Sequence, residues 1–292
     1  MTDSLSYIIS ESERSGRDFF DIVIEEDMKE TGKSRDESFS DMRDMYRAMK
    51  DSIFNYNPEL KSHSGMTGTD GAKITKRITE GKMICGPLIS KVMERALMVA
   101  ESNACMKRIV AAPTAGSCGV MPAVLVTAEE TYDFDEDKMV EALFVAGGIG
   151  GVIACRASLA GATGGCQAEI GSASAMAAGA LTFLFDNDAR KIANSAALAL
   201  KGLMGLVCDP VAGLVEVPCV KRNVIGAVNA VTCTDMTLAG IESKIPPDEV
   251  IDAMRAVGRC MVPELKETGK GGLAGTLSGC RIRDELKKGK ER

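Results

Sequence analysis

The sequence predicts an all-α fold. Apolar residues recur at helical spacing through most of its 292 residues, whereas the period-2 alternation typical of strands is scarce. Several helical stretches also begin with Pro or Ser or end before Pro. A chain of this length buries a sizeable core and suits one large domain or two smaller ones.

Residues 1–60 predict two charged amphipathic helices. Phe19, Phe20, Val23 and Ile24 recur at helical spacing, and Met42, Met45, Tyr46 and Met49 do so further along. We expect residues 1–60 to be a helical segment packed on the main body. Residues 61–292 are then expected to form the catalytic domain as one continuous unit. A subunit-docking arm is the alternative for the first segment.

The main body predicts further helices separated by small-residue loops. Pro113 ends the first of them, and Ser172 is the expected N-cap of the helix that runs to Phe185. The expected helical ranges are 88–110, a helix started by Pro122, an Ala/Gly-rich stretch from 137, then 173–185, 191–207, 223–240 and a last long helix from 246. A charged tail follows.

Composition excludes several function classes. A net charge of −6, no Trp and only 4% aromatic residues argue against a nucleic-acid partner. The longest charge-free apolar run, 142–155, is shorter than the ~18 residues that a membrane span needs. Ten cysteines without a secretory leader indicate the reducing cytosol, so we expect a cytoplasmic protein without disulfides.

Three cysteines, Cys166, Cys208 and Cys219, are each flanked by Gly or Pro. Loops of this kind bring distant sulfurs to one centre. Three thiolates are one short of the four that normally hold an iron–sulfur cube, which leaves one iron open to act as a Lewis acid. The alternative is a set of buried thiols that act as small hydrophobes. The spacing C-x41-C-x10-C is too long for the usual zinc patterns, so the residues alone leave both open.

Polar loops supply further candidates. The stretch 61–71 is rich in Gly, Ser and Thr, and its Ser62, Ser64 and Gly65 are candidates to bind a substrate carboxylate through backbone N–H groups and hydroxyls. His63, the only histidine, is a candidate base or a plain surface residue. Thr69 stands where the family that the motifs below resemble is expected to have glycine.

Ser117, in the loop 113–122, is a candidate for hydrogen bonding to substrate or for tight packing. Lys221 and Arg222 follow Cys219 and place two cations beside the site, where they suit a substrate carboxylate or the charge of a cluster; a solvated basic pair is the alternative.

Three long motifs carry a family resemblance. Residues 112–123 (APTAGSCGVMPA), 165–177 (GCQAEIGSASAMA) and 208–219 (CDPVAGLVEVPC) resemble the alpha chain of iron–sulfur-dependent L-serine dehydratase, and the similarity extends over about 62–274. The resemblance implies that Cys166, Cys208 and Cys219 hold a [4Fe–4S] cluster with one labile iron. It also implies an L-serine ammonia-lyase that eliminates water from L-serine and yields pyruvate and ammonia, a step of amino-acid degradation and gluconeogenesis.

The same resemblance implies a partner. In that family the catalytic base is a histidine on a separate beta subunit or N-terminal domain, so we expect a heterodimer, with His63 as the in-chain candidate. Relatives in one chain carry a C-terminal cysteine that occupies the open iron, a role for which Cys280 is the candidate. Two alternatives stay open: an L-cysteine desulfidase-like lyase, and a non-catalytic cluster-bearing redox sensor subunit.

Overall fold

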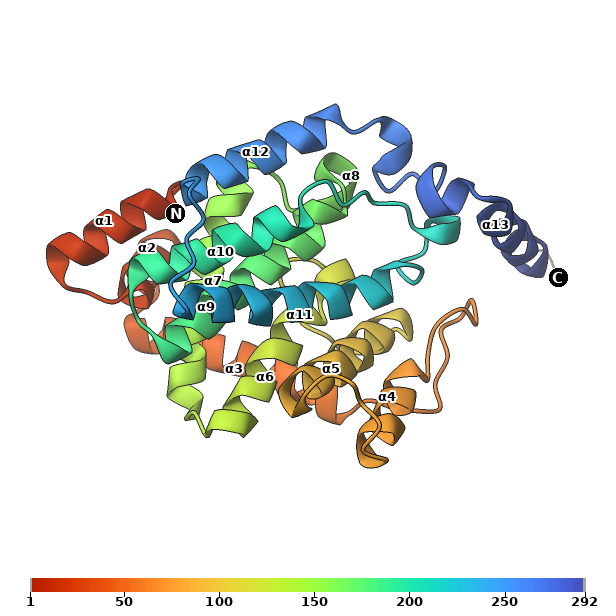
Figure 1. The fold of residues 1–292 in the computed structure, drawn as a ribbon, viewed down its shortest axis with the longest axis horizontal. Coiled ribbons are helices and arrows are strands. Elements are labelled where there is room, and N and C mark those ends of the chain that lie inside the picture. The colour runs from red at the N-terminus through yellow and green to blue at the C-terminus, as the bar shows by residue number, and fades with distance from the viewer. Residues whose placement is uncertain (1, 291–292) are drawn as a thin grey trace.

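The computed structural model describes residues 2–290, and its regular structure is entirely helical (Figure 1). The predicted all-α class is therefore confirmed: within 2–290 the only β-type pairing is an isolated bridge between Cys208 and Lys266. The longer helices are α1 Leu5–Ser15, α2 Phe19–Thr31, α3 Arg35–Phe54, α4 Asp70–Thr79, α5 Pro87–Ala104, α6 Val120–Tyr132, α7 Glu136–Arg156, α9 Ser172–Phe185, α10 Ala189–Leu203, α11 Cys219–Leu238, α12 Pro247–Cys260 and α13 Leu277–Lys290. Short helical turns lie between them: α8 Gly161–Gly164 and the segments η1 Ala115–Ser117, η2 Gln167–Gly171, η3 Val211–Gly213, η4 Pro263–Leu265 and η5 Gly272–Gly275.

Helix α9 is the centre of the molecule. Every residue from Ser172 to Leu184 is buried, because α6, α7, α10 and α11 pack around it (Figure 1). Its many Ala and Gly residues let these neighbours approach closely: a Cβ at Gly179 would overlap the Ile149 side chain of α7. The Ala-rich composition of this stretch is thus explained by packing on all sides.

The glycines of α7 serve the same purpose. A Cβ at Gly148 would overlap the Val23 side chain of α2, and one at Gly150 would lie 2.9 Å from the sulfur of Met176 in α9. The structure confirms that this Gly-rich stretch allows close helix packing, and α7 is sandwiched between the N-terminal segment and the centre.

The N-terminal segment contains three helices, so the prediction of two was wrong. Gly16 and Gly32 both adopt left-handed φ and end α1 and α2. Ser34 then starts α3 with a capping box: its Oγ accepts from the Glu37 backbone N–H, and the Glu37 carboxylate accepts from the Ser34 backbone. The two predicted apolar sets lie in α2 and α3, and the helix that the prediction missed is α1, which buries only Leu5 and Ile8.

Asp248 of α12 holds the start of α1 against α12. Its carboxylate accepts hydrogen bonds from the Leu5 backbone N–H (2.8 Å) and the Ser4 hydroxyl (2.7 Å) at the start of α1. Burial raises the pKa of Asp248, but the hydrogen bonds outweigh it and hold that pKa below its usual value. A charged acceptor at the positive end of α1 therefore stabilises this contact.

One predicted helix start is wrong in an informative way. Ser172 has helical dihedrals and is completely buried, and its hydroxyl makes no hydrogen bond in the described structure. The helix instead starts next to Cys166, through one wide π-type turn at η2. Such turns are rare and occur often at functional sites.

The other boundaries differ by a few residues, except at the C-terminus. Helix α5 ends at Ala104 rather than near 110, and α11 begins at Cys219 itself. The segment expected as a charged tail forms α13, which lies at the edge of the molecule beside η3 and η5 (Figure 1).

Two helical stretches, Glu136–Arg156 and Gln167–Phe185, are long and apolar enough to cross a membrane by length and composition. The structure buries 67% and 89% of their apolar windows, respectively, among other helices. Their apolar character is therefore that of core helices.

Candidate metal centre

The three Gly/Pro-flanked cysteines lie at the ends of helices that converge. Cys166 precedes η2, Cys208 lies in the loop after α10, and Cys219 is the first residue of α11. All three are buried, with at most 8% of their surface exposed. No histidine lies beside them in the sequence, since the only histidine, His63, is in the loop before α4.

Cys208 is held by an unusual backbone contact. Its N–H donates to the Leu265 carbonyl at 2.9 Å, and its carbonyl accepts from the Glu267 N–H at 2.7 Å. The C-terminal segment after α12 thus fixes the loop that carries this sulfur, although more than 50 residues separate the two in sequence. Because the N–H and the carbonyl of Cys208 are both hydrogen-bonded, its backbone is fixed, and its side chain leaves the loop in a defined direction.

The three thiols influence one another. Burial raises the pKa of Cys166 to about 11 and that of Cys219 to about 12, and the pKa of Cys208 lies higher still. After burial, the charge of Cys166 is the next cause that raises the pKa of both other thiols. Three thiols that cannot easily ionise on their own are suited to a metal, which displaces their protons.

The cysteines are not arranged for one small ion. Among the residues that the structure describes, no group of three or more His, Cys, Asp or Glu side chains is close enough to hold a single metal ion. A cube of four irons separates its cysteine ligands more widely than a mononuclear site does. A donor set made only of cysteines is the kind that holds iron–sulfur clusters.

Arg222 is the cation of this centre. Its guanidinium contacts the Cys166 thiol and lowers the pKa of Cys166 and Cys219, against the larger effect of burial. It also donates to the Val207 carbonyl (2.8 Å) and pairs with the buried Asp209 carboxylate (2.9 Å). A fixed positive charge beside three sulfurs suits the negative charge of a thiolate-bound cluster.

Asp209 in turn holds the C-terminal glycine loop. Its Oδ2 accepts from the Leu273 N–H at 2.8 Å, and Gly272, with φ +56°, lies so close that a Cβ there would overlap the Asp209 side chain. Only glycine tolerates both the conformation and the approach. The loop 269–275 therefore packs against the segment that carries Cys208.

Glu169 is a site residue that we did not predict. Its Oε2 lies 4.0 Å from the Cys208 Sγ, and its charge raises the pKa of all three thiols. Burial raises its own pKa, while a hydrogen bond from Thr114 opposes that effect. A signal was present in the sequence: Glu169 is the only charged residue between Arg156 and Asp186. An isolated charge in an apolar stretch calls for a partner or a function.

The loop of Ser117 reaches the same place. Thr114 donates to Glu169 Oε1 at 2.9 Å, and the completely buried Ser117 hydroxyl lies 3.2 Å from the Thr114 hydroxyl. Asn223 fixes this loop, since its amide donates to the Gly116 carbonyl (2.8 Å) and accepts from the Gly119 N–H (2.9 Å). Ser117 is therefore connected to Glu169 through the Thr114 hydroxyl, by two hydrogen bonds in succession.

The predicted carboxylate-binding serines contact a carboxylate of this chain. Ser62 and Ser64 both donate to Glu216 Oε2, at 2.6 and 2.7 Å. Glu216 belongs to the loop between Cys208 and Cys219, so this contact joins the serine loop to the cysteine loop. Gly65, with φ +75°, is exposed, and a Cβ there would meet nothing. The expectation of glycine at Thr69 had a physical basis, because Thr69 adopts φ +72°.

The backbone N–H groups after this loop are occupied. Those of Asp70 and Gly71, at the start of α4, donate to the buried Glu101 carboxylate at 2.8 and 3.1 Å. Lys221 pairs with Asp70 at 2.6 Å and remains half exposed. Lys221 therefore points towards α4, whereas its neighbour Arg222 points towards the cysteines.

His63 lies at the surface of the serine loop. It lines a cavity of about 240 Å³ together with Ser64, Glu216 and the α13 residues Arg283 and Lys287. Within residues 2–290, His63 makes no hydrogen bond or ion pair, so nothing fixes the orientation of its ring.

Cys280, the predicted fourth cysteine, lies in the first turn of α13. Its thiol is 3.8 Å from the carbonyl oxygens of Ala274 and Gly275. These are contacts within the C-terminal segment, and Cys280 is not among the charges that shift the other three thiols.

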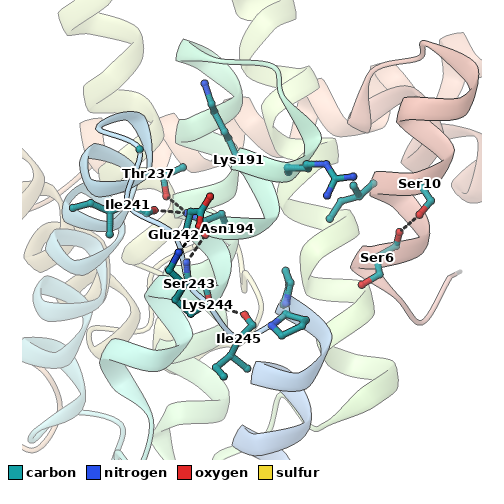
Figure 2. Close-up of a pocket in the computed structure, with 15 residues that line it drawn as sticks. Ser6, Ser10, Lys191, Asn194, Thr237, Ile241, Glu242, Ser243, Lys244 and Ile245 are labelled. Atoms are coloured by element: carbon teal, nitrogen blue, oxygen red, sulfur yellow. Dashed lines mark hydrogen bonds and ion pairs between the residues drawn. The ribbon is translucent and has the colours of Figure 1, made fainter.

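A larger cavity lies elsewhere. It measures about 530 Å³ and is bounded by α1, α10 and the loop 240–247 (Figure 2). Asn194 organises its floor: it donates to Thr237 and to the Ile241 carbonyl, both at 2.9 Å, and accepts from the Ser243 N–H at 2.7 Å. None of the predicted site residues lines this cavity, and these polar groups satisfy one another.

Comparison with known proteins finds relatives that match this chain over most of its length. Residues 14–274 match the family described as serine dehydratase alpha chain. A protein of Bacillus subtilis named probable L-serine dehydratase, alpha chain, is 45% identical over 91% of this chain and 89% of its own length. The L-serine dehydratase alpha chain of Peptoniphilus asaccharolyticus is 42% identical over 99% of this chain and all of its own. An L-serine dehydratase of Mycobacterium bovis is 45% identical, but this chain covers only 40% of it. The chain belongs to the serine dehydratase alpha chain family.

Proposed function

We propose that this chain is the alpha subunit of an L-serine dehydratase that converts L-serine to pyruvate and ammonia, with a [4Fe–4S] cluster held by Cys166, Cys208 and Cys219. The observation that carries the proposal is the convergence of three buried, mutually interacting thiols beside Arg222 in a member of this family. The family supports a metal cofactor in general, and the all-sulfur donor set supports a cluster in particular.

Elimination of water has three requirements. A base removes the proton from Cα, the hydroxyl leaves as water after gaining a proton, and the carboxylate is held still. The resulting aminoacrylate tautomerises and takes up water, which releases ammonia and leaves pyruvate. When bound, the cluster supplies a Lewis acid that stabilises the departing hydroxide.

The residues of this chain then have separate tasks. Ser62 and Ser64 already donate two short hydrogen bonds to one carboxylate oxygen, that of Glu216, and a substrate carboxylate is the chemically equivalent ligand. Arg222 balances the negative charge of the sulfurs. Gly65, Ser117 and Lys221 remain proposed substrate contacts in the surrounding loops, and Cys280 remains a proposed fourth ligand in the absence of substrate.

The base is proposed to come from a partner. The relatives are named alpha chains, which supports a separate beta chain, and His63 is exposed and unoriented in this chain. A general base must be held within hydrogen-bond reach of the proton that it takes. We therefore propose a cytoplasmic heterodimer in which the beta subunit supplies the base, with His63 as the alternative.

We also propose the division into a helical segment, 1–60, packed on a continuous catalytic unit, 61–292. It is supported by the packing of α2 and α3 on α7 and by the Asp248 contacts to α1.

The decisive experiment is anaerobic purification followed by iron and sulfide analysis and a pyruvate assay with L-serine, with and without the beta chain. We expect about four irons per chain and pyruvate only from the pair. An L-cysteine desulfidase would instead release sulfide from cysteine in preference, and a redox sensor would carry iron without any turnover. Either result would replace the proposed function.

A further inference from the structure

Glu169 is a partly buried carboxylate, and no cation among the residues that the structure describes pairs with it. Within residues 2–290 it forms no ion pair. Its hydrogen bonds come from the Thr114 hydroxyl at 2.9 Å and the Cys208 thiol at 4.0 Å. A carboxylate taken out of water needs a partner of opposite charge or several donors. Glu169 has neither.

The nearest cation does not fill this role. The Arg222 guanidinium is engaged with the Val207 carbonyl and the Asp209 carboxylate, and it acts on Cys166 and Cys219. It is absent from the groups that shift the pKa of Glu169. Within residues 2–290 no cation pairs with Glu169, so a cation that binds this carboxylate would come from outside the described residues.

Two glycines lie directly against this carboxylate. A Cβ at Gly161 would lie 2.6 Å from Glu169 Oε2 and 2.9 Å from the Cys208 sulfur, and a Cβ at Gly116 would lie 3.2 Å from Oε1. At these two positions Glu169 is therefore flanked by backbone, where a side chain would crowd the carboxylate.

We propose that Glu169 binds the α-ammonium group of the amino-acid substrate. The inference deepens the proposed function and rests on it. L-serine has three polar groups, and the serine loop and the metal centre account only for its carboxylate and hydroxyl. Its ammonium is the cation that the isolated carboxylate lacks. A site built this way rejects acids without the amino group, because an unpaired buried carboxylate would remain.

The test compares two ligands that differ only in the ammonium group and cannot lose water. L-alanine and propionate both carry the carboxylate, and neither has a β-hydroxyl. Their dissociation constants are measured by anaerobic calorimetry on the cluster-loaded alpha–beta complex. In Glu169→Gln we expect L-alanine to bind about 100-fold more weakly, which is about 2.8 kcal/mol at 1.4 kcal/mol per tenfold. Propionate should bind as well as before or better, because a repelling charge has been removed.

Two further variants complete the experiment. Glu169→Asp keeps the charge on a shorter side chain and should recover part of the preference for L-alanine. Glu94→Gln removes a more deeply buried carboxylate, one paired with Lys91 on α5, and should leave the preference unchanged.

The outcomes separate the possible failures. An unchanged ratio of L-alanine to propionate affinity in Glu169→Gln overturns the inference, as does loss of iron from that variant, which would make Glu169 a metal ligand. If Glu169→Gln does not fold, an unaltered ratio in Glu169→Asp, together with equal affinity of the parent for both ligands, overturns it. Absence of pyruvate formation by the parent complex would instead overturn the proposed function.

Discussion

The cysteine region and the serine-loop region differ in how firmly they are held. Around Cys166, Cys208 and Cys219, buried backbone contacts and the Arg222–Asp209 pair connect the loop segments on every side. Around His63, the loop meets the surface, and the neighbouring cavity is lined by His63, Ser64, the loop 212–216 and α13. The comparison supports the proposal that the chain by itself holds the metal centre, whereas His63, the proposed in-chain base, has no partner within residues 2–290 that orients its ring.

The largest expected effect comes from replacing the three cysteines of the cysteine region. Replacement of Cys166, Cys208 or Cys219 by Ser should each abolish the brown chromophore and the bound iron, since three ligands are already the minimum. Cys233, buried within α11, and Cys155, exposed on α7, provide the matched controls and should keep full iron when replaced. Full iron retention in Cys208→Ser would rule out the proposed ligand set.

The next largest effect concerns the serine-loop region and tests whether His63 or the beta subunit supplies the base. If the beta subunit supplies the base, His63→Ala in the complex should keep kcat within about threefold of the parent, because an exposed and unoriented ring contributes little. A loss of about 10²–10⁴-fold in kcat, the usual contribution of general base catalysis, would move that role to His63. Rates of pyruvate formation at saturating L-serine decide between the two.

Gly272 tests how much its close contact with Asp209 contributes to the stability of the cysteine region. Gly272→Ala should lower the free energy of unfolding by about 2 kcal/mol or more, because it combines positive-φ strain with a clash against Asp209. Gly240→Ala is the control: it has φ +85° but open space around it, so it reports the strain alone. Urea unfolding of both variants measures the difference, and equal losses would mean that contact with Asp209 is unimportant.

The buried thiols predict a pH dependence of stability in the metal-free chain. Unfolded cysteines ionise near pH 8.5, whereas burial raises the pKa of Cys166 to about 11 and that of Cys219 to about 12. Above pH 8.5 the unfolded state binds fewer protons, so stability should fall with rising pH by up to about 1.4 kcal/mol per unit for each thiol.

Loading with metal should remove this dependence for the three ligands, since their protons are already gone. Cys118 and Cys233, with pKa values raised by burial to about 12 and about 11, should retain it. Urea midpoints at pH 8, 9 and 10, with and without the cluster, give the two slopes. Identical slopes would argue against ligation by the buried thiols.

Cys280 gives the smallest expected effect. If it occupies the open iron at rest, Cys280→Ala should shorten any lag before steady turnover and shorten the lifetime of the cluster in oxygen. Cluster spectra and progress curves of the two proteins measure this. Spectra, lifetimes and lags that match the parent would leave Cys280 as a residue of α13 whose thiol contacts Ala274 and Gly275.

The sequence by itself determined the helical class, because the helical spacing of apolar residues is a local property. The choice of the three cysteines rested on the resemblance of their motifs to a family, and their role as ligands stays a prediction. The same resemblance indicated glycine at Thr69, and the left-handed φ of Thr69 gives a physical reason for it. Gly148 and Gly150 of α7 were correctly interpreted as sites of close packing, since glycine is otherwise unfavourable in a helix.

Only the tertiary structure decided which charges meet. Ser172 has the composition of an N-cap, but burial against four helices placed it inside a continuous helix that begins at Cys166. Lys221 and Arg222 are adjacent in sequence, yet the 100° turn between neighbouring helical residues points one to Asp70 and the other to the cysteines. Glu169 faces the three sulfurs because segments 114–117, 161–169 and 208–219 fold together. Contacts between residues this far apart depend on the packing of whole helices, which no local pattern encodes.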